Sequence, residues 1–466
     1  VRKPSHPMRL AVRRGAVQTP RTPQLRAVRR SCSSGASQPL SELPPYDCVR
    51  FEHVAAAMHR IRDGIVRTPS QRSHWLSEMT GSNIYLKMEQ QQFTGSFKER
   101  GARNALLSLD DDQMRRGVVA ASAGNHALAL CWHGLQLGIP VTVVMPTVAP
   151  MAKVDKCRIF GANVVIHGQH IGEARQHALE VYSDLSYING YDDPPIIAGT
   201  GTIGMEMLEQ VPSCDAIIVP VGGGGLIAGI ALAAKTLNPR VRVIGVEPKR
   251  CASYTAALEA GRPVLADVMP TLADGLAVPQ VGAHAFSVAR HWVDEIVTVD
   301  EADVALSVLR LLEGEKMVVE GGGATGLAAM LPGRPLDRDD LKGMNVLVPL
   351  CGGNIDVTVL GRVIERGLAA DGRLVRLTVP VSDRPGGIAE LATALAAIGA
   401  SVKDLFHERA WLHTSVDRVV VKAILETRGF EHNHDILRHL HELGYDARVN
   451  EGDLHAGFGG ELSRAS

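Results

Sequence analysis

Four consecutive glycines, Gly222 to Gly225, join an apolar strand to an apolar helix, and this junction strongly limits the folds open to the chain. Residues 216–221, just before the glycines, are almost all apolar, which is typical of a strand buried on both faces. Residues 141–145 have the same character. Such strands occur where helices cover both faces of a parallel sheet, so the junction predicts an α/β domain.

Apolar strands alternate with helical stretches over residues 46–370, which we expect to form one large α/β unit with mostly parallel sheets. A chain of 466 residues is too long for a single core, so we expect further domains beside this unit. The expected strands are residues 83–87, 118–121, 141–145, 163–166, 216–221, 241–246, 295–299 and 345–350.

Composition excludes several classes of function. The chain has 49 basic and 50 acidic side chains, so we expect no general attraction to nucleic acid or to a membrane. Aromatic residues make up only 4% of the chain, which disfavours a stacking surface for single strands. No apolar run reaches the roughly 18 residues that cross a bilayer. The seven cysteines include no C-x-x-C pair, which argues against a disulfide or zinc framework and indicates a reducing compartment.

The N-terminal segment, residues 1–45, differs from the rest of the chain. It carries nine Arg or Lys residues and no acidic residue before Glu42. This bias is typical of a disordered transit peptide, so we expect a mitochondrial protein, with a plastid or the cytoplasm as alternatives. A basic tail that binds an acidic partner is the other interpretation.

Lys98 lies in the segment Thr94-Gly95-Ser96-Phe97-Lys98-Glu99-Arg100-Gly101-Ala102. A lysine amine attacks an aldehyde cofactor only when it is neutral, which burial or a nearby cation can arrange. We therefore expect Lys98 to be partly buried. The glycines of residues 222–225 let backbone N–H groups converge on a phosphate at the start of a helix.

Two further positions suit the same cofactor. Asn125, in the segment Ser122-Ala123-Gly124-Asn125-His126, offers an amide donor and acceptor for a phenolic oxygen. Cys351 follows another buried strand and could face a ring nitrogen without charging it.

Each motif also has a simpler interpretation when it is taken alone. Lys98 could be a solvated surface lysine, and Cys351 an ordinary buried cysteine. The glycine run could be a dinucleotide loop, but no G-x-G-x-x-G fingerprint with its acidic partner opens the chain. Residues 122–126 could be only a helix cap. The four motifs together favour a pyridoxal phosphate site.

Residues 47–367, with these four motifs in the same order, resemble the fold-type II pyridoxal-phosphate enzymes, and among them the threonine/serine dehydratases. The resemblance implies two α/β lobes, as in the tryptophan synthase β chain, with the cofactor in the cleft between them. It also implies the role of each motif residue: Lys98 forms the Schiff base, Phe97 packs beside the ring, Asn125 binds the 3-oxygen, Gly222, Gly223, Gly224, Gly225 and Leu226 bind the phosphate, and Cys351 meets the pyridine nitrogen.

The same resemblance implies deamination of L-threonine to 2-oxobutyrate, and of L-serine to pyruvate, by β-elimination. The substrate carboxylate would lie on the loop Ser122, Ala123, Gly124, Asn125 and His126. A serine dehydratase or serine racemase is an alternative, although Ala123 stands where the racemases carry a serine that reprotonates the far face. A catalytically inactive amino-acid sensor is a third reading, against which the intact Lys98 argues.

A metal ion is not expected. Many members of the resembled family bind a cation at the segment Gly245-Val246-Glu247-Pro248, through that glutamate and a second acidic side chain a few residues on. Glu247 is therefore a weak candidate ligand, but Ser253 stands where we expect the second acid, and Glu247 could instead cap or pair locally.

Residues 373–450 predict a second fold, with strands at 374–381, 402–408, 417–425 and 445–449 and helices at 388–398 and 430–443. This β-α-β-β-α-β order, with the turn Asp383-Arg384-Pro385-Gly386, resembles an ACT domain. The resemblance implies a regulatory domain that binds an amino-acid effector between copies, in a homo-oligomer such as a dimer or tetramer.

The histidines at 432, 434, 439 and 441 could ligate a metal, but their spacing favours a solvated helix face. Residues 451–466 are expected to be a flexible tail.

Overall fold

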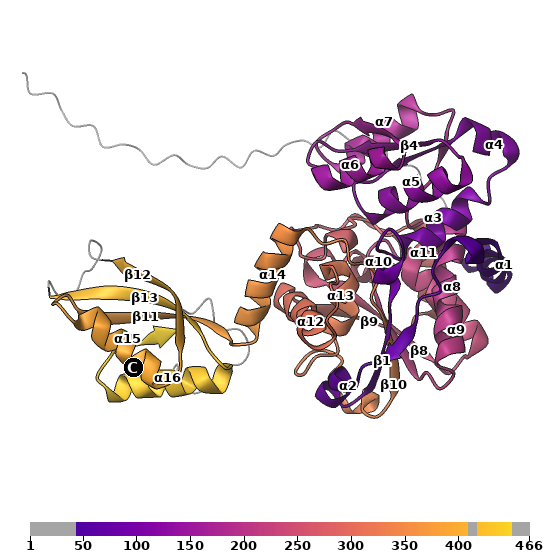
Figure 1. The fold of residues 1–466 in the computed structure, drawn as a ribbon. Coiled ribbons are helices and arrows are strands. Elements are labelled where there is room, and N and C mark those ends of the chain that lie inside the picture. Colours follow the sequence, from indigo (N-terminus) through magenta and orange to yellow (C-terminus); the bar gives the residue numbers. More distant parts are fainter. Residues whose placement is uncertain (1–42, 409–416, 450–466) are drawn as a thin grey trace, which may run out of the picture. The chain divides into compact units, whose positions relative to one another are not determined.

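The computed structural model describes residues 43–408 and 417–449 of the chain (Figure 1). A six-stranded sheet has the order β1-β2-β10-β7-β8-β9. All neighbours in it are parallel except the edge strand β1, which runs antiparallel to β2. The strands are β1 (Ser70–Arg72), β2 (Asn83–Lys87), β7 (Ala216–Pro220), β8 (Arg242–Pro248), β9 (Glu295–Val299) and β10 (Asn345–Pro349).

Alternate residues of these strands enter two separate hydrophobic cores. Ile217 and Val219 point into one core and Ala216 and Ile218 into the other, so both faces of β7 are buried, as its continuous apolar character predicts. Helices α1 (Phe51–Ile61), α8 (Pro194–Gln210), α9 (Gly225–Leu237), α10 (Ser253–Ala260) and α11 (Ala283–Trp292) contribute to the first core. Helices α2 (His74–Thr80), α12 (Glu301–Gly314), α13 (Gly321–Ala328) and α14 (Val357–Ala370) contribute to the second.

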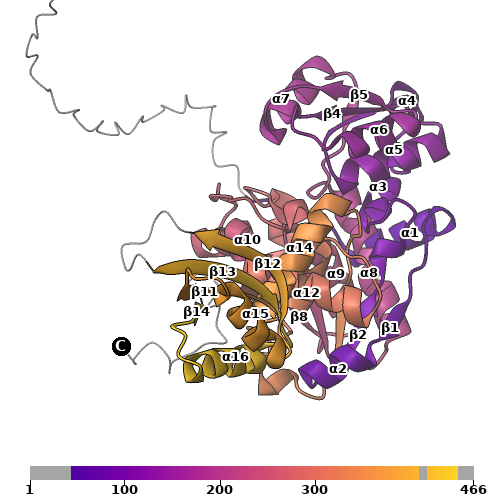
Figure 2. The same ribbon diagram turned by 60° about the vertical axis from the view of Figure 1, so that its left-hand side comes forward.

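A smaller, four-stranded parallel sheet has the order β5-β4-β3-β6. Its strands are β3 (Val118–Ala121), β4 (Val141–Met145), β5 (Asn163–Ile166) and β6 (Ser186–Tyr187). Helices α3 (Lys98–Leu106), α5 (Asn125–Leu137) and α6 (Met151–Ile159) pack on one face and α7 (Ile171–Val181) on the other, while the short α4 (Asp111–Arg116) precedes β3. Figure 2 shows α3 at the junction of the two sheet units, where it contacts both α5 and α8.

The fold class is confirmed: the chain forms α/β layers with parallel sheets, and each of the eight expected strands is present within one or two residues of its expected bounds. Two strands were missed. β1 is a polar edge strand of three residues, Ser70–Arg72, and β6 has only two residues, so neither carries the apolar run that predicts a strand. No helix in the described part of the chain has the length and apolar character to span a membrane.

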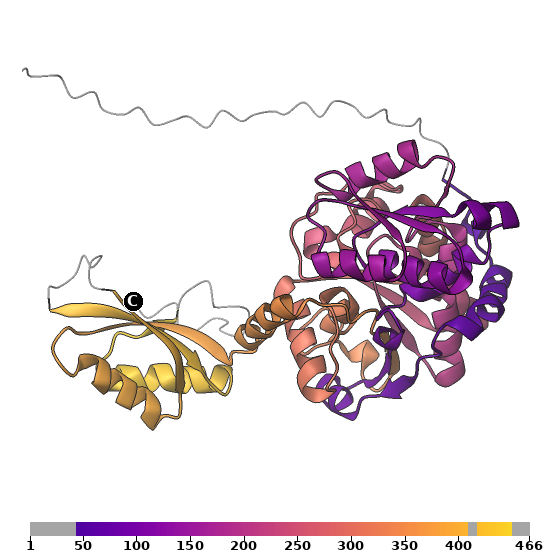
Figure 3. The same cartoon turned by 45° about the horizontal axis from the view of Figure 1, so that its top comes forward.

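The C-terminal unit is an antiparallel sheet with both of its helices on one face (Figure 3). The elements follow the expected order: β11 (Leu374–Ser382), α15 (Gly387–Ala397), β12 (Ser401–Glu408), β13 (Arg418–Glu426), α16 (Phe430–Glu442) and β14 (Arg448–Val449). The sheet order is β12-β13-β11-β14. Alternate residues of β11, beginning with Val375 and Leu377, enter its own core, as a half-buried strand requires.

The prediction that the α16 histidines form a solvated face is wrong for His432. Its side chain is buried, with Nδ1 accepting from the backbone N–H of Arg428 and Nε2 lying 2.9 Å from the carbonyl oxygen of Ile398. His432 therefore ties α16 to the end of α15. The expected tail, residues 451–466, and nearly all of the expected transit segment, residues 1–45, lie outside the described residues.

Candidate active site

The predicted site residues follow the carboxyl ends of parallel strands in both sheets. Residues 122–126 follow β3, the glycines of residues 222–225 follow β7, and Cys351 follows β10. Ligands of α/β proteins bind at this end of the sheet, because loops and helix N-termini converge there. The topology thus brings together three segments that are far apart in the sequence.

Lys98 is the first residue of α3, and the loop before it is fixed to the end of β10. Ser96 forms an isolated antiparallel bridge with Gly352, and the backbone N–H of Phe97 donates 3.0 Å to the carbonyl oxygen of Cys351. These two contacts hold Lys98 beside Cys351.

The Lys98 side chain is partly buried, as expected. Its Nζ donates a hydrogen bond of 2.6 Å to the carbonyl oxygen of Gly190 and lies 5.1 Å from the centre of the Phe97 ring. Burial lowers the pKa of Lys98 to about 8, although Cys351 and Glu320 oppose the shift. A substantial fraction of this amine is therefore neutral near physiological pH and able to attack an aldehyde.

A fully buried ionic cluster surrounds Arg100, two residues after Lys98 on α3. Arg100 pairs with Glu89 and Glu206, at 2.8 Å in each case, and Glu206 also pairs with Lys87 at 2.6 Å. Burial works against the charge of Arg100, but its two carboxylate partners raise its pKa overall. The cluster joins β2, the 3-10 helix η3 (Glu89–Gln91), α3 and α8, so it fixes the element that carries Lys98.

The glycine run is required by close packing as well as by backbone conformation. Gly224 has a φ of 91°, a Cβ on Gly223 would lie 2.4 Å from the Tyr191 ring, and a Cβ on Gly225 would lie 2.0 Å from the Tyr191 carbonyl oxygen. The N–H groups of Gly222, Gly223 and Gly224 have no acceptor among the described residues. They lie at the N-terminus of the 13-residue helix α9, a favourable place for an anion.

The remaining residues predicted at the glycine run and at the 122–126 loop contribute mainly backbone. The Leu226 side chain belongs to a hydrophobic core. The His126 ring is buried, its Nε2 lies 3.3 Å from the carbonyl oxygen of Ile188, and burial together with the charge of Lys98 lowers its pKa to about 3. The His126 ring is therefore neutral, and its Nδ1 has no partner among the described residues. The backbone N–H of His126, at the start of α5, also has no acceptor there.

Asn125 begins α5 and makes two side-chain hydrogen bonds that sequence reasoning missed. Its Nδ2 donates 2.6 Å to Oε1 of Glu320, and its Oδ1 accepts from Nδ2 of Asn354 at 2.9 Å. Before it in the same loop, the N–H of Gly124 donates 3.3 Å to Oγ of Ser122. No sequence motif identifies Glu320 as a site residue. Its position just before the glycines that open α13 is the one feature that could have suggested it.

Cys351 is 4% exposed, and its Sγ donates 3.4 Å to the carbonyl oxygen of Pro349. Burial, with the charges of Glu89 and Glu320, raises the pKa of this thiol well above its ordinary value. Cys351 therefore remains a neutral thiol and can meet a ring nitrogen without placing a charge there.

These features fit an aldehyde cofactor that carries a phosphate. The lysine amine is neutral in part, and the N–H groups of residues 222–224 are open to an anion. The hydroxyl oxygens of Thr94 and Ser96, close to Lys98 in the chain, are buried without a partner among the described residues, which is costly unless a ligand or water satisfies them.

Glu247 caps a helix. One oxygen accepts from the N–H of Tyr254 at 2.7 Å, and the other accepts from the N–H and the hydroxyl of Thr255 at 2.8 and 2.6 Å. Both carboxyl oxygens are thus occupied at the start of α10, as the local reading of this residue allowed. Within the described residues, no group of three or more His, Cys, Asp or Glu side chains could hold a metal ion.

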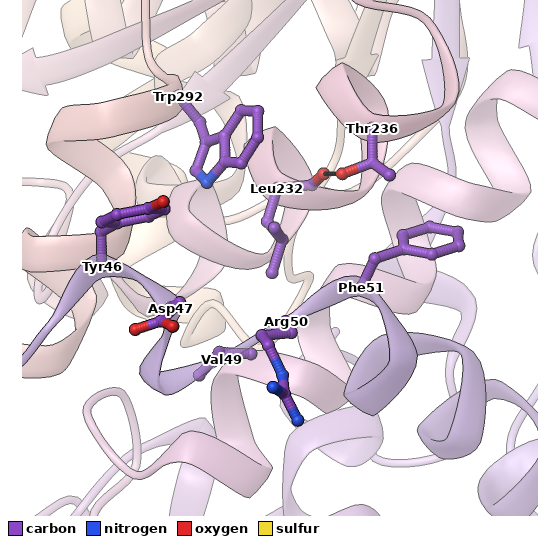
Figure 4. A pocket seen from close by; sticks show the side chains of 8 residues that line it. All are labelled: Tyr46, Asp47, Val49, Arg50, Phe51, Leu232, Thr236 and Trp292. Atoms are coloured by element: carbon purple, nitrogen blue, oxygen red, sulfur yellow. Dashed lines mark hydrogen bonds between the residues drawn. The ribbon is translucent and has the colours of Figure 1, made fainter.

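A small cavity lies apart from these residues (Figure 4). It has a volume of about 140 Å³ and lies between the first described turns of the chain, α9 and Trp292. Its one internal hydrogen bond runs from the Thr236 hydroxyl to the carbonyl oxygen of Leu232, at 2.7 Å. No predicted site residue lines this cavity, so it is not the candidate active site.

Comparison with known proteins agrees with this geometry. A protein-family model described as "Pyridoxal-phosphate dependent enzyme" matches residues 61–352. The chain is 41% identical over 403 residues to a Thermotoga maritima protein named L-threonine ammonia-lyase, and the alignment covers 86% of this chain and 99% of that protein. The alignment is longer than the segment matched by the family model, so the similarity extends beyond that segment.

Two solved structures resemble about two thirds of the chain. The processed form of threonine deaminase isoform 2 from Solanum lycopersicum has a TM-score of 0.65 and 35% identity, over 68% of this chain and 92% of that chain. Serine racemase from Dictyostelium discoideum has a TM-score of 0.63 and 34% identity, over 66% of this chain and 99% of that chain. These proteins carry names of two different activities, so the fold by itself does not choose between them.

Proposed function

The chain belongs to the family of pyridoxal-phosphate-dependent enzymes, and on that basis we propose that it deaminates L-threonine to 2-oxobutyrate and ammonia, and L-serine to pyruvate and ammonia. The observation that carries the proposal is the Lys98 amine, held beside the neutral Cys351 thiol and with a pKa lowered to about 8 by burial. The relative that aligns over 403 residues, named L-threonine ammonia-lyase, supports the choice of substrate.

Pyridoxal phosphate, when bound, supplies an electron sink for the electrons of the substrate Cα, while the chain supplies attachment and orientation. Lys98 would hold its aldehyde carbon, and the N–H groups of Gly222, Gly223 and Gly224 would hold its phosphate. The neutral Cys351 thiol would meet the ring nitrogen. A neutral partner limits the charge stored in the ring, which suits elimination.

Proton transfer falls to Lys98. With the substrate amine bound in its place, Nζ of Lys98 would be free to accept the proton from the substrate Cα, and the hydroxyl group would leave Cβ as water after gaining a proton. Within the loop of residues 122–126, the N–H groups of Ala123, Asn125 and His126 have no acceptor among the described residues and would hold the substrate carboxylate at the start of α5. The enamine that leaves the enzyme is hydrolysed to the 2-oxo acid and ammonia.

Serine racemisation is the second candidate, favoured by the likeness to serine racemase. It requires a second acid on the face of the substrate opposite Lys98. Ala123, in the loop proposed to bind the substrate, has no group that transfers a proton. We therefore expect L-serine to yield pyruvate without D-serine.

Steady-state kinetics with both amino acids would test the proposal. We expect 2-oxo acid release from L-threonine and L-serine, and a visible absorption band in the purified holoenzyme. Chiral chromatography of serine after incubation separates the two candidates, because a racemase would accumulate D-serine. A colourless chain that takes up no pyridoxal phosphate would contradict the proposal as a whole.

We propose further that the C-terminal unit, residues 373–450, is an ACT-like regulatory domain that binds an amino-acid effector, in a homodimer or homotetramer. A cavity of about 560 Å³ supports a small-ligand site there; it is lined by the turn of residues 382–386, by the start of α15 and by His407. Kinetics repeated with isoleucine, valine and nucleotide, together with light scattering, would test the effector and the assembly.

A mitochondrial address is also proposed for residues 1–45, supported by nine basic residues and no acidic residue before Glu42. Fusing these residues to a fluorescent protein tests it. Signal in mitochondria is the expected result, and signal in plastids or throughout the cytoplasm would contradict it.

A further inference from the structure

Asn125 is the middle member of a hydrogen-bond chain that runs from a backbone carbonyl to a buried carboxyl group. Nδ2 of Asn354 donates 2.6 Å to the carbonyl oxygen of Thr94 and 2.9 Å to Oδ1 of Asn125. Nδ2 of Asn125 then donates 2.6 Å to Oε1 of Glu320. The Asn125–Asn354 and Asn125–Glu320 bonds join residues 229 and 195 positions apart.

The direction of this chain is fixed by its first member. A backbone carbonyl can only accept, so the NH₂ group of Asn354 must face Thr94. Its second N–H then meets the oxygen of Asn125, and the NH₂ group of Asn125 must face Glu320. An amide has two N–H donors, so one N–H of Asn125 is left over once Glu320 has accepted the other.

We propose that Glu320 and Asn354 are positioning residues that hold the Asn125 amide in one orientation, so that it offers a donor, not an acceptor, to the phenolic oxygen of the cofactor. The inference rests on the proposed function, since it concerns how this chain meets pyridoxal phosphate. Without Glu320 and Asn354, an asparagine at the start of a helix could present either its oxygen or its NH₂ group to the cofactor.

Two glycines lie against Glu320 and Asn354. A Cβ on Gly352 would lie 2.3 Å from Oε1 of Glu320, and a Cβ on Gly95 would lie 2.7 Å from Oδ1 of Asn354. The two glycines let the backbone approach the polar groups closely. Glu320 is 7% exposed, so water does not readily replace its bond to Asn125.

Side chains on several other elements act on the charge of Glu320. Burial and the carboxylate of Asp274 raise its pKa to about 7, while Lys153 and the Asn125 amide oppose the rise. Lys98 and Cys351 also face it, since each interacts with Glu320 electrostatically. Glu320 is thus partly ionised near neutrality, and a carboxyl oxygen accepts from Asn125 in either protonation state.

A double-mutant cycle on the cofactor-stripped chain tests the inference. The affinity for pyridoxal phosphate is measured by fluorescence titration, and the absorption maximum of the bound cofactor is recorded. We expect Glu320→Met and Asn354→Ala each to weaken binding about tenfold or more and to shift the maximum, since each removes one hydrogen bond from the Asn125 amide. Glu320→Gln keeps an acceptor oxygen and is expected to stay within about threefold of wild type with an unshifted maximum.

The decisive arm repeats Glu320→Met and Asn354→Ala in an Asn125→Ala background, where we expect no further loss beyond about twofold because both act through that amide. Equal losses with and without Asn125 would overturn the inference. If Glu320→Met does not fold, the Asn354→Ala pair and the Glu320→Gln spectrum still decide. Asp274→Asn is the matched control; it alters the field on Glu320 but breaks no bond to Asn125, so a shifted maximum there would also count against the inference.

The two proposals fail in different ways. A wild-type chain that binds no pyridoxal phosphate and releases no 2-oxo acid refutes the function. A wild-type chain that does both, with losses in the cycle that simply add, refutes only the positioning role of Glu320 and Asn354.

Discussion

Two basic residues on α3, Lys98 and Arg100, respond to burial in opposite ways. Arg100 is buried against two carboxylates and remains charged, with its pKa raised by Glu89 and Glu206. Lys98, two residues earlier, is partly buried and has no ion pair among the described residues, and desolvation lowers its pKa to about 8. Burial with partners preserves a charge for structure, whereas burial without them creates a group that gains and loses a proton near neutral pH.

Glu320 belongs with Lys98 in this comparison. It is buried, it has an amide as its hydrogen-bond partner in place of a cation, and its pKa rises to about 7. Lys98 and Glu320 thus both have a pKa near neutrality, whereas Arg100 stays charged. Substitutions of these residues test the contrast.

Replacing Lys98 should have the largest effect on function. We expect Lys98→Ala to lower kcat/KM for L-threonine by about a thousandfold or more and to abolish the visible absorption band, because Lys98 is the residue proposed to bind the cofactor aldehyde and to accept the Cα proton. Circular dichroism would verify that the fold is retained. Turnover at the wild-type rate would rule out the mechanism.

Arg100→Met should have the largest effect on stability. It leaves Glu89 and Glu206 buried without their common cation, so we expect the free energy of unfolding to fall by about 3–5 kcal/mol in urea. Arg67→Met is the matched control, since Arg67 pairs with Glu209 of the same helix α8 but both side chains are more than half exposed. The control should change stability by less than about 1 kcal/mol. Equal losses in the two variants would show that the buried cluster has no special role.

Glu320 should make stability depend on pH in a specific direction. Its pKa in the folded chain, about 7, lies above its ordinary value of 4.5, so the neutral form is favoured by folding. Its contribution is fully present below pH 4.5 and is lost as the pH rises through 7. Relative to Glu320→Gln, the cofactor-free wild type should lose about 3 kcal/mol between pH 4.5 and 8. Glu259→Gln, at an exposed position of α10, is the control. The difference in unfolding free energy between wild type and this variant should stay nearly constant between pH 4.5 and 8.

The lowered pKa of Lys98 should control how fast the cofactor binds. Only the neutral amine attacks the aldehyde, so the association rate of pyridoxal phosphate with the stripped chain should rise about tenfold per pH unit below pH 8 and level off above it. Stopped-flow absorbance measures this rate. A plateau that begins only above pH 10 would mean that Lys98 titrates like an exposed lysine, and the contrast with Arg100 would then lose its basis.

The sequence predicted the parts of this molecule that depend on local pattern. Continuous apolar runs such as 141–145 indicated strands with two buried faces, and alternation in 374–381 indicated a strand with one. The motifs around Lys98, the four glycines and Cys351 can be recognised in the sequence because each is a short segment whose residue types suit a cofactor, and their roles stay predictions. The two missed strands, β1 and β6, are too short to show any periodicity.

The tertiary structure decided which groups surround those motifs. Glu320 and Asn354 reach Asn125 across separations of 195 and 229 residues, and Gly190 meets the Lys98 amine from 92 residues away. A single sequence cannot specify such contacts, because they depend on how the carboxyl ends of strands from two sheets converge. Side-chain identity determined what chemistry the chain can supply. Burial and hydrogen-bond or charged partners exist only in the folded chain. They determined that Arg100 stays charged, while the pKa of Lys98 falls to about 8 and that of Glu320 rises to about 7.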